Sequence, residues 1–212
     1  MNTKLIVLFL TISLLTACTM TSQTPEEAFP DISYLENNED LNVATLAGGC
    51  FWCMEPPFEA LEGVEAVISG YSGGEEDRPS YKEVSSGQTS HTEAVQIFYN
   101  PKQVSYDQLL DTFWQAHDPT DDGGQFADRG KHYRPVIFFQ SEEEETIAEK
   151  SKQALQDSRK FDQPILTAIE EFTNFFPAEE YHQNYYIKQS PHYQRYKKGS
   201  GREDFLDNNW EK

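Results

Sequence analysis

The sequence is poor in basic residues, and this shortage limits the partners that the protein can have. It contains 17 Lys and Arg against 36 Asp and Glu, which gives a formal net charge of −19. An acidic surplus of this size argues against nucleic acid or an anionic membrane surface as a binding partner. Only Glu142 to Glu145 forms a run of like charge, and a solvated first turn of a helix explains that run.

Apolar runs long enough to span a bilayer are also missing from the N-terminus. The run from Leu5 to Leu15 follows Lys4 and has about eleven residues, fewer than a membrane-spanning helix needs. It predicts a signal peptide over residues 1–17. Leu15-Thr16-Ala17-Cys18 resembles a bacterial lipobox, in which the cysteine after the cleavage point carries a diacylglyceryl group on its sulfur. We therefore expect a protein that is exported and lipid-anchored through Cys18 to a membrane of the bacterial cell envelope. An ordinary cleavage site that leaves Cys18 as a free thiol is the alternative.

Apolar residues are scarce again from Thr19 to about Asn42, where Thr, Ser, Gln, Pro, Glu, Asp and Asn predominate. Such a segment cannot bury enough surface to offset the entropy that it would lose on ordering. We expect residues 18–42 to form a lipidated N-terminus and a disordered tether. Residues 43–212 have a length that fits one domain, and no internal repeat divides them.

Cysteine is scarce as well, because the chain has only three. A lipidated Cys18 would leave Cys50 and Cys53, whose Cys-x-x-Cys spacing is shared by metal knuckles and thioredoxin-type sites. The residues between them, Phe51 and Trp52, favour a redox site. Metal ligands need a compact polar surrounding, whereas two large rings can grip a small apolar group beside a nucleophile. We expect no metal site.

Hydrophobic periodicity predicts the fold class. Short apolar or alternating segments that end in glycine, asparagine or proline predict strands at 42–47, 64–71, 91–99, 134–139 and 165–172. Helical spacing predicts helices at 50–61, 105–117 and 142–157, and Ser105 is the expected N-cap of the second. The order β-α-β-β-α-β predicts an α+β fold, a two-layer sandwich with a ferredoxin-like core plus a C-terminal extension.

A series of motifs, collinear from about residue 43 to 212, resembles the peptide methionine sulfoxide reductase A family. They are Gly49-Cys50-Phe51-Trp52, Gly70 to Gly74, Pro79-Ser80-Tyr81, His91 to Val95, His117-Asp118-Pro119-Thr120, Gly124 to Arg134 and Tyr181-His182-Gln183. The resemblance implies that residues 43–212 are a catalytic domain that reduces the S epimer of methionine sulfoxide. It implies methionine sulfoxide in proteins or peptides as substrate, a thioredoxin-like reductant as partner, no cofactor, and a monomer.

The chemistry of sulfoxide reduction assigns roles to three residues. The reaction needs a nucleophile for sulfur and a proton for the departing oxygen. Cys50 lies where a strand passes through two glycines into a helix, and the N–H groups of the first turn should lower its pKa. Glu93 has apolar neighbours in its strand, so burial would keep it protonated as the general acid. Attack leaves a sulfenic acid on Cys50, and Cys53 is the only intramolecular thiol that can resolve it.

The resemblance adds a substrate-binding set. It places the family's catalytic glutamate at Glu93 and the tyrosines that hydrogen-bond the sulfoxide oxygen at Tyr81 and Tyr133. It places the aspartate that orients substrate and water at Asp128. Phe51 and Trp52 would form the methyl pocket, where sulfur–aromatic contacts add ~0.3–1.5 kcal/mol. The residues His117 and His182 are expected to cap helices or to hydrogen-bond within the core.

Two other functions remain open from the sequence. A thiol–disulfide oxidoreductase or isomerase would use Cys50 and Cys53 on proteins, and it predicts a thioredoxin-like sheet. A non-catalytic lipoprotein that binds metal or peptide would tolerate the loss of Cys50. Reduction of a methionine sulfoxide peptide by the purified protein separates both from a reductase.

Overall fold

The computed structural model describes residues 29–210. The predicted signal peptide, Cys18 and the first part of the predicted tether lie outside these residues. Within the described range, no helix is both long and apolar enough to cross a membrane.

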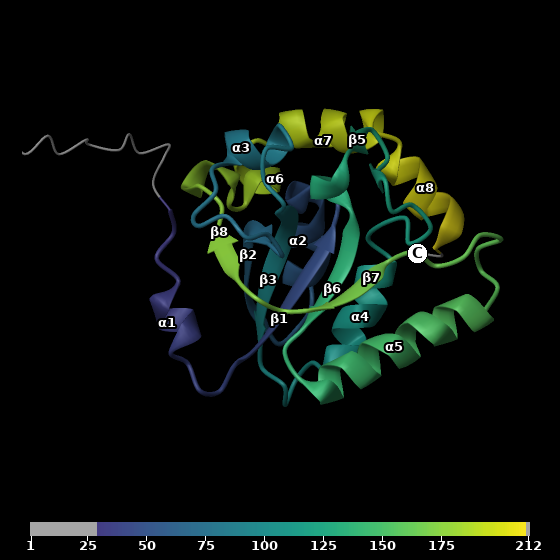
Figure 1. Ribbon diagram of the computed structural model, residues 1–212, viewed down its shortest axis with the longest axis horizontal. Helices are drawn as coiled ribbons and strands as arrows, with labels where there is room; N and C mark the ends of the chain where they lie inside the picture. The colour runs from purple at the N-terminus through teal and green to yellow at the C-terminus, as the bar shows by residue number, and fades with distance from the viewer. Residues whose placement is uncertain (1–28, 211–212) are drawn as a thin grey trace, which may run out of the picture.

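The secondary structure contains every strand and helix predicted from periodicity, with ends that differ by a few residues. The elements are α1 (Ser33–Glu36), β1 (Asn42–Gly48), α2 (Phe51–Glu59), β2 (Val64–Ser72), α3 (Tyr81–Ser85), β3 (Thr92–Tyr99), α4 (Tyr106–Trp114), β4 (Gly124–Gln125), β5 (Asp128–Arg129), η2 (Lys131–Tyr133), β6 (Pro135–Phe139), α5 (Glu142–Asp157), β7 (Ala168–Glu171), β8 (Phe175–Pro177), η3 (Glu180–His182), α6 (Tyr185–Lys188), α7 (Ser190–Gly199) and α8 (Arg202–Asn209) (Figure 1). Ser105 accepts a hydrogen bond from the Gln108 N–H, which confirms it as the N-cap of α4.

The main sheet has six strands in the order β7-β6-β1-β3-β2-β8. Its central strands, β6, β1, β3 and β2, are antiparallel to one another, and the helices α2 and α4 provide the two crossovers. This arrangement confirms the predicted ferredoxin-like wiring. β7 adds a parallel strand beside β6, and β8 adds an antiparallel strand beside β2.

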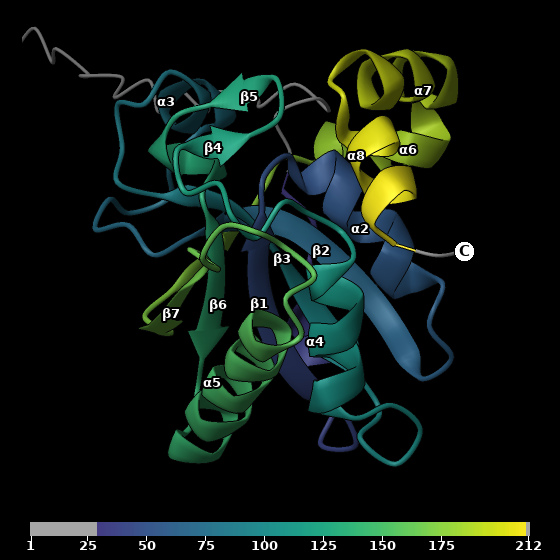
Figure 2. The same ribbon diagram turned by 90° about the vertical axis from the view of Figure 1, so that its right-hand side faces the viewer.

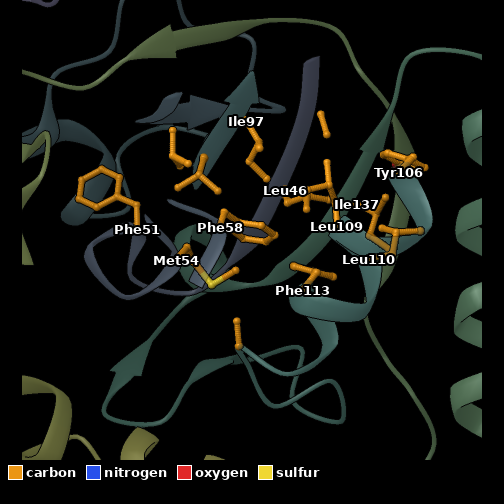
Figure 3. Packing of buried hydrophobic residues seen from close by; sticks show 14 of the residues in the cluster. Leu46, Phe51, Met54, Phe58, Ile97, Tyr106, Leu109, Leu110, Phe113 and Ile137 are labelled. Atoms are coloured by element: carbon orange, nitrogen blue, oxygen red, sulfur yellow. The ribbon is translucent and has the colours of Figure 1, made fainter. Parts of the chain in front are cut away.

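The main core lies between the sheet and the helices α2, α4 and α5, which cover one face (Figure 2). Figure 3 shows Met54 and Phe58 of α2 packed beside the core side chains of α4 and the sheet. These side chains are fully buried because apolar residues recur at helical spacing on α2 and α4 and alternate along the strands. The apolar positions of α2 thereby fix the helix, and its N-terminal cysteine, against the sheet.

The opposite face of the sheet is covered by two segments of the chain. The link between β7 and β8 passes across it, as Figure 1 shows, and it joins the two edge strands through residues 172–174 alone. So short a link requires a strongly curled sheet. A Cβ at Gly73 of the β2 end would lie 2.8 Å from the ring of Phe138 of β6, which agrees with this curl.

Residues before β1 form the second cover, and here the prediction of a disordered tether up to residue 42 needs correction. Ile32 and Leu35 are buried, and they pack with Phe98 on the outer face of the sheet. The physical reason is that these two apolar residues, spaced at i and i+3 around the short helix α1, find an apolar surface that composition alone did not reveal. The folded part of the chain therefore begins before residue 43.

The C-terminal extension forms the helices α6, α7 and α8, which periodicity did not predict. They lie at the same end of the molecule as α3 and the hairpin of β4 and β5, in both views (Figures 1 and 2). The N-terminus of α2 opens at this end. The extension, the hairpin and α3 thus surround the two cysteines.

Candidate active site

The turn between β1 and α2 positions the first cysteine. Gly49 has a φ of +87°, in the left-handed region that favours glycine. A Cβ at this residue would lie 2.6 Å from the Cβ of Gln125 and 2.7 Å from the Nη2 of Arg202. Only glycine fits both the backbone and the space. Cys50 follows as the N-cap of α2 and is 5% exposed.

Cys50 and Cys53 lie together as a pair of thiols. Both are free and buried, and their sulfurs hydrogen-bond to each other. Burial raises the pKa of Cys50 well above its ordinary value, and the hydrogen bond with Cys53 adds to the rise. The same hydrogen bond lowers the pKa of Cys53 to about 7 against the effect of burial, with help from the positive charge of Arg202. The pair therefore loses its first proton near neutral pH, and the hydrogen bond and the charge of Arg202 favour the negative charge on Cys53.

The prediction that the helix N-terminus lowers the pKa of Cys50 is wrong. Two N–H groups of the first turn have other acceptors. The Phe51 N–H donates to Glu93 Oε2 at 3.1 Å, and the Cys53 N–H donates to the carbonyl of Cys50 at 3.0 Å. A thiolate on Cys50 would therefore lack the support that a free helix N-terminus gives.

Glu93 lies on β3 and is 1% exposed, so its predicted burial is confirmed. Burial raises the pKa of its carboxyl well above the ordinary value, and the nearby Asp128 adds to the rise, while the hydrogen bond from the Phe51 N–H opposes it. Burial therefore favours the neutral, protonated form of the carboxyl. Since Oε2 accepts the Phe51 N–H, Oε1 is left to carry the proton.

The structure brings Tyr81, Tyr133 and Asp128 to the same site. Burial raises the pKa of both tyrosines, and the charges of Glu93 and Cys50 add to the rise in each. Burial also raises the pKa of Asp128. These mutual electrostatic effects mean that the two hydroxyls and the carboxyl lie near the thiol and Glu93, although they come from α3, η2 and β5.

Local structure explains how these three residues are held. Ser80 caps α3 through a capping box with Glu83, which fixes the start of the helix at Tyr81. The loop that carries Asp128 is fastened by Gln125, whose amide donates to the carbonyls of Asp118 and Asp121 and accepts the Asp118 N–H. The side chains are thus supported by the backbone around them.

The aromatic pair between the cysteines divides into a buried and a partly exposed ring. Phe51 is fully buried, and its ring centroid lies 6.3 Å from that of Trp52. Trp52 stacks on Tyr185, with centroids 3.8 Å apart and planes 8° apart, and its Nε1–H donates to Nδ1 of His182 at 3.0 Å. The two rings of the predicted methyl pocket are therefore held in place, Phe51 by burial and Trp52 by its contacts with Tyr185 and His182.

His182 is buried and hydrogen-bonded within the core, as the sequence predicted, and so is His117. Burial lowers the pKa of each to about 3, so both rings are neutral. Because Nδ1 of His182 accepts the Trp52 N–H, its proton resides on Nε2. His182 therefore orients Trp52 and carries no charge.

Sequence reasoning missed Tyr193, Tyr196 and Arg202, which α7 and α8 bring to the site. The Tyr193 hydroxyl hydrogen-bonds to Cys53, and the Tyr196 hydroxyl donates to Asp128 Oδ2. The spacing of the two tyrosines, i and i+3, was the only signal in the sequence, because it puts them on one face of a helix. Arg202 gave no signal, since arginine in a polar segment ordinarily lies at the surface.

The assembled site combines a thiol pair, one thiolate near neutral pH, a neutral buried carboxyl and two neutral tyrosine hydroxyls. A thiol nucleophile beside a proton donor can reduce a polar S=O group, and a second thiol at hydrogen-bonding distance can form a disulfide. Among residues 29–210, no group of three or more His, Cys, Asp or Glu side chains is placed to hold a metal ion. The arrangement is suited to two-electron thiol chemistry.

Comparison with known sequences agrees with this chemistry. The family model of peptide methionine sulfoxide reductase matches residues 42–212. A peptide methionine sulfoxide reductase MsrA of Listeria monocytogenes serotype 4b (strain CLIP80459) is 55% identical over 172 residues, which make up 81% of this chain and 97% of that protein. The residues that the family model matches include the whole ferredoxin-like core and the C-terminal helices.

Solved structures agree as well. The crystal structure of Mxr1 from Saccharomyces cerevisiae in reduced form aligns with a TM-score of 0.68 and 36% identity, over 73% of this chain and 88% of that chain. The crystal structure of Mxr1 in complex with Trx2 aligns with a TM-score of 0.50 and 26% identity, over 70% of this chain and 87% of that chain.

Proposed function

The chain belongs to the peptide methionine sulfoxide reductase family, and from this premise we propose that Cys50 is the nucleophile, Glu93 the proton donor and Cys53 the resolving thiol. The protein is an oxidoreductase that reduces methionine sulfoxide to methionine by thiol chemistry. The observation that carries the residue roles is the hydrogen-bonded pair of Cys50 and Cys53 beside the buried, neutral Glu93. A thiol–disulfide isomerase with a thioredoxin-like sheet, the alternative from the sequence, does not agree with the ferredoxin-like order of the strands.

In the first step, the Cys50 sulfur attacks the sulfoxide sulfur while Glu93 gives its proton to the oxygen. The net change converts the Cys50 thiol and the sulfoxide into a Cys50 sulfenic acid and a thioether. The substrate sulfur gains two electrons and the Cys50 sulfur loses two. The hydroxyls of Tyr81 and Tyr133 hydrogen-bond to the oxygen as negative charge develops on it. Phe51 and Trp52 hold the methyl group, and Asp128 orients the substrate.

In the second step, Cys53 attacks the sulfenic sulfur, a disulfide forms and water leaves. The first turn of α2 must deform, because residues i and i+3 of a helix have Cβ atoms ~5–6 Å apart and a disulfide needs ~3.5–4.5 Å. Pro56 and Pro57 lie within α2 and lower the free energy that this deformation costs. They lack the N–H groups that would bond to the carbonyls of Trp52 and Cys53.

The substrate and the reductant follow from the same family. We propose the S epimer of methionine sulfoxide, free or in proteins and peptides, as the substrate, since one type of enzyme serves each epimer. A thioredoxin-like dithiol reduces the disulfide, a step supported by the complex of the similar protein Mxr1 with Trx2. The protein acts as a monomer.

The place of action is the cell envelope. The motif Leu15-Thr16-Ala17-Cys18 supports export and lipid attachment, and the substrates would then be oxidised envelope proteins. A reductant in the cytosol could reach the enzyme only through a relay across the membrane.

An assay of the purified protein tests the activity and the roles of the two thiols. With dithiothreitol and a peptide that carries racemic methionine sulfoxide, about half of the substrate should lose about sixteen mass units, as expected for one epimer. Without added reductant, Cys53→Ser should release one equivalent of product and stall as a sulfenic acid that dimedone traps. Cys50→Ser should release none, and a full equivalent of product from this variant would sink the assignment of the nucleophile.

A further inference from the structure

Arg202, at the start of α8, is among the largest fully buried side chains of the described residues, at 1% exposed. Its Nη1–H donates to the carbonyl of Ala116, and its Nη2–H donates to the carbonyl of Gly48 at 3.0 Å. Its guanidinium lies over the ring of Phe126, 4.8 Å from the centroid. None of the ion pairs among residues 29–210 includes Arg202.

A buried cation without an acidic partner is costly, because its desolvation is offset only in part by neutral carbonyl groups. The guanidinium therefore needs a negative charge nearby. Its charge lowers the pKa of Asp128 and that of Cys53, and of these two groups only Cys53 belongs to the thiol pair that reacts. Arg202 has no part in the mechanism as stated above.

The position of Arg202 relates it to both cysteines. Its Nη2 lies 2.7 Å from the place where a Cβ of Gly49 would be, directly before Cys50. Its Nη1 lies 4.0 Å from the Sδ of Met54, directly after Cys53. The guanidinium thus lies against the turn and the helix segment that carry the thiols.

The other titratable groups around Cys53 do not provide an equivalent positive charge. The groups that act on it are Cys50 from the start of α2, Glu93 from β3, Asp128 from β5, Tyr193, Tyr196 and Lys197 from α7, and Arg202. The Asp128 carboxyl disfavours a thiolate on Cys53, and burial favours the neutral forms of Glu93 and the tyrosines. Lys197 is only partly buried, so solvent and salt screen it. Arg202 is the cation in this set that is out of reach of such screening.

We propose that Arg202 is the counter-charge that holds Cys53 as a thiolate in the resting enzyme, and that Cys53 takes up the Cys50 proton when Cys50 attacks. This proposal rests on the roles proposed above for the two cysteines. Arg202 is a positioning residue, because it acts through Cys53 and not on the substrate.

The step balances in atoms and charge. The S–H bond of Cys50 breaks and its proton passes to the Cys53 thiolate along the hydrogen bond that already joins them. Glu93 gives its proton to the sulfoxide oxygen. The products are the thioether, a Cys50 sulfenic acid, a Cys53 thiol and a Glu93 carboxylate, with one negative charge before and after the step.

The same charge favours recycling of the enzyme. The Cys50–Cys53 disulfide carries no charge, so its formation leaves Arg202 uncompensated in a buried place. Stabilisation of a thiolate in the reduced state makes a disulfide more oxidising. Arg202 therefore helps the reductant to return the enzyme to its dithiol form.

The test is the pH dependence of Cys53 alkylation in the reduced protein. Iodoacetamide would be applied between about pH 5 and about pH 10, and fragment mass spectrometry would locate the modified cysteine. In Arg202→Met the midpoint should move upward, with a loss of reactivity at neutral pH on the order of tenfold. Arg202→Lys, which keeps the charge, should restore most of the reactivity. Lys197→Met is the matched control, and it should shift the midpoint less and only at low salt.

A second readout is the equilibrium of the disulfide with a dithiothreitol redox buffer. Arg202→Met should favour the disulfide, by a change in the equilibrium constant on the order of tenfold, whereas Lys197→Met should not. Circular dichroism checks that each variant is folded, and Arg202→Lys supplies the comparison if Arg202→Met does not fold.

Two results would overturn the proposal. One is an alkylation profile of Arg202→Met that superimposes on the wild type, and the other is a profile of Arg202→Lys that moves as far as that of Arg202→Met. Neither readout uses methionine sulfoxide. A wild-type protein that fails to reduce the sulfoxide would therefore contradict the proposed function. The alkylation profile and the disulfide equilibrium would still show whether Arg202 stabilises the Cys53 thiolate.

Discussion

At the scale of single residues, the site depends on a carboxyl that stays neutral beside a thiolate. Burial is the main cause that raises the pKa of Glu93, and the single hydrogen bond from the Phe51 N–H does not reverse it. The Cys pair, in contrast, has lost one proton near pH 7 because its two sulfurs share the other. Burial thus favours the protonated form of the acid, while the Cys pair can carry a negative charge on Cys53 that accepts the Cys50 proton.

We predict that Glu93→Gln keeps substrate binding but slows the chemical step by ~10²–10⁴-fold, because the amide donates a hydrogen bond without a transferable proton. The pH dependence follows from the two shifts. The wild-type single-turnover rate should rise through about pH 7 as the cysteine pair loses its first proton. It should fall at higher pH as Glu93, whose pKa is raised, loses its proton. Glu93→Gln should lack the fall.

Glu55 offers a matched control, because it is also a buried carboxyl. Burial raises its pKa to about 8, yet it accepts its hydrogen bond from the Asn184 N–H at 3.1 Å, away from the thiols. Glu55→Gln should keep the wild-type rate and both limbs of the profile. An unchanged rate in Glu93→Gln at neutral pH would show that Glu93 is not the acid.

At the scale of elements, the junction of β1 and α2 decides where the nucleophile lies. The strand is fixed by its pairing with β3 and β6, and the helix is fixed by Met54 and Phe58 in the core. Only Gly49 lies between the last residue of the strand, Gly48, and the N-cap of the helix, Cys50. A change in this turn must therefore move Cys50 or deform its surroundings.

We predict that Gly49→Ala destabilises the protein by about 1–3 kcal/mol and slows single turnover. The left-handed φ of +87° is strained for alanine, and its Cβ would meet Gln125 and Arg202. Gly199→Ala is the control, since nothing lies within 4 Å of its Cβ position, and it should be neutral or stabilising. Urea unfolding and the single-turnover rate measure both effects, and a Gly49→Ala protein as stable and active as the wild type contradicts the argument.

The core elements could be predicted because their signals are local. Apolar spacing within each segment gave the order of strands and helices, and the Cys-x-x-Cys spacing and the apolar neighbours of Glu93 gave the centre of the site. The helix α7 could not be found in this way, because its apolar positions are mainly Tyr193 and Tyr196. Tyr193 is buried and Tyr196 half-buried, and they contact Cys53 and Asp128, which are distant in sequence.

The two errors have the same origin in long-range contacts. The pKa of Cys50 was predicted in the wrong direction mainly because the fold buries the thiol and pairs it with Cys53. In addition, Glu93, 42 residues from Phe51, accepts an N–H group that was expected to support a thiolate. The predicted tether extended too far, to residue 42, because Ile32 and Leu35 are buried against Phe98. No local sequence pattern indicates this contact. Contacts of this kind decide protonation and order, and a single sequence does not reveal them.

At the scale of the whole molecule, charge is concentrated unevenly. The chain has a formal net charge of −19, yet residues 183–202 contain no Asp or Glu and five cations, which are Lys188, Arg195, Lys197, Lys198 and Arg202. This segment forms the helices that surround the thiol end of the sheet (Figure 2). Positive charge therefore lies where the thiolate must form, while the acidic remainder keeps the protein away from anionic surfaces.

An enzyme with so acidic a surface needs another means of staying at a membrane, and we predict that Cys18 supplies it through covalent lipid. Each buried CH₂ of an acyl chain contributes ~0.8 kcal/mol, so several chains anchor a protein where one is marginal. Wild-type protein should therefore sediment with membranes, with a lipid-modified N-terminal peptide in mass spectrometry. Cys18→Ala should appear in the soluble fraction or keep its signal peptide, with unchanged sulfoxide reduction in the detergent-solubilised protein, because Cys50 and Cys53 lie in the folded domain. Wild-type protein found soluble with an unmodified N-terminus contradicts lipid anchoring and leaves the reductase activity untouched.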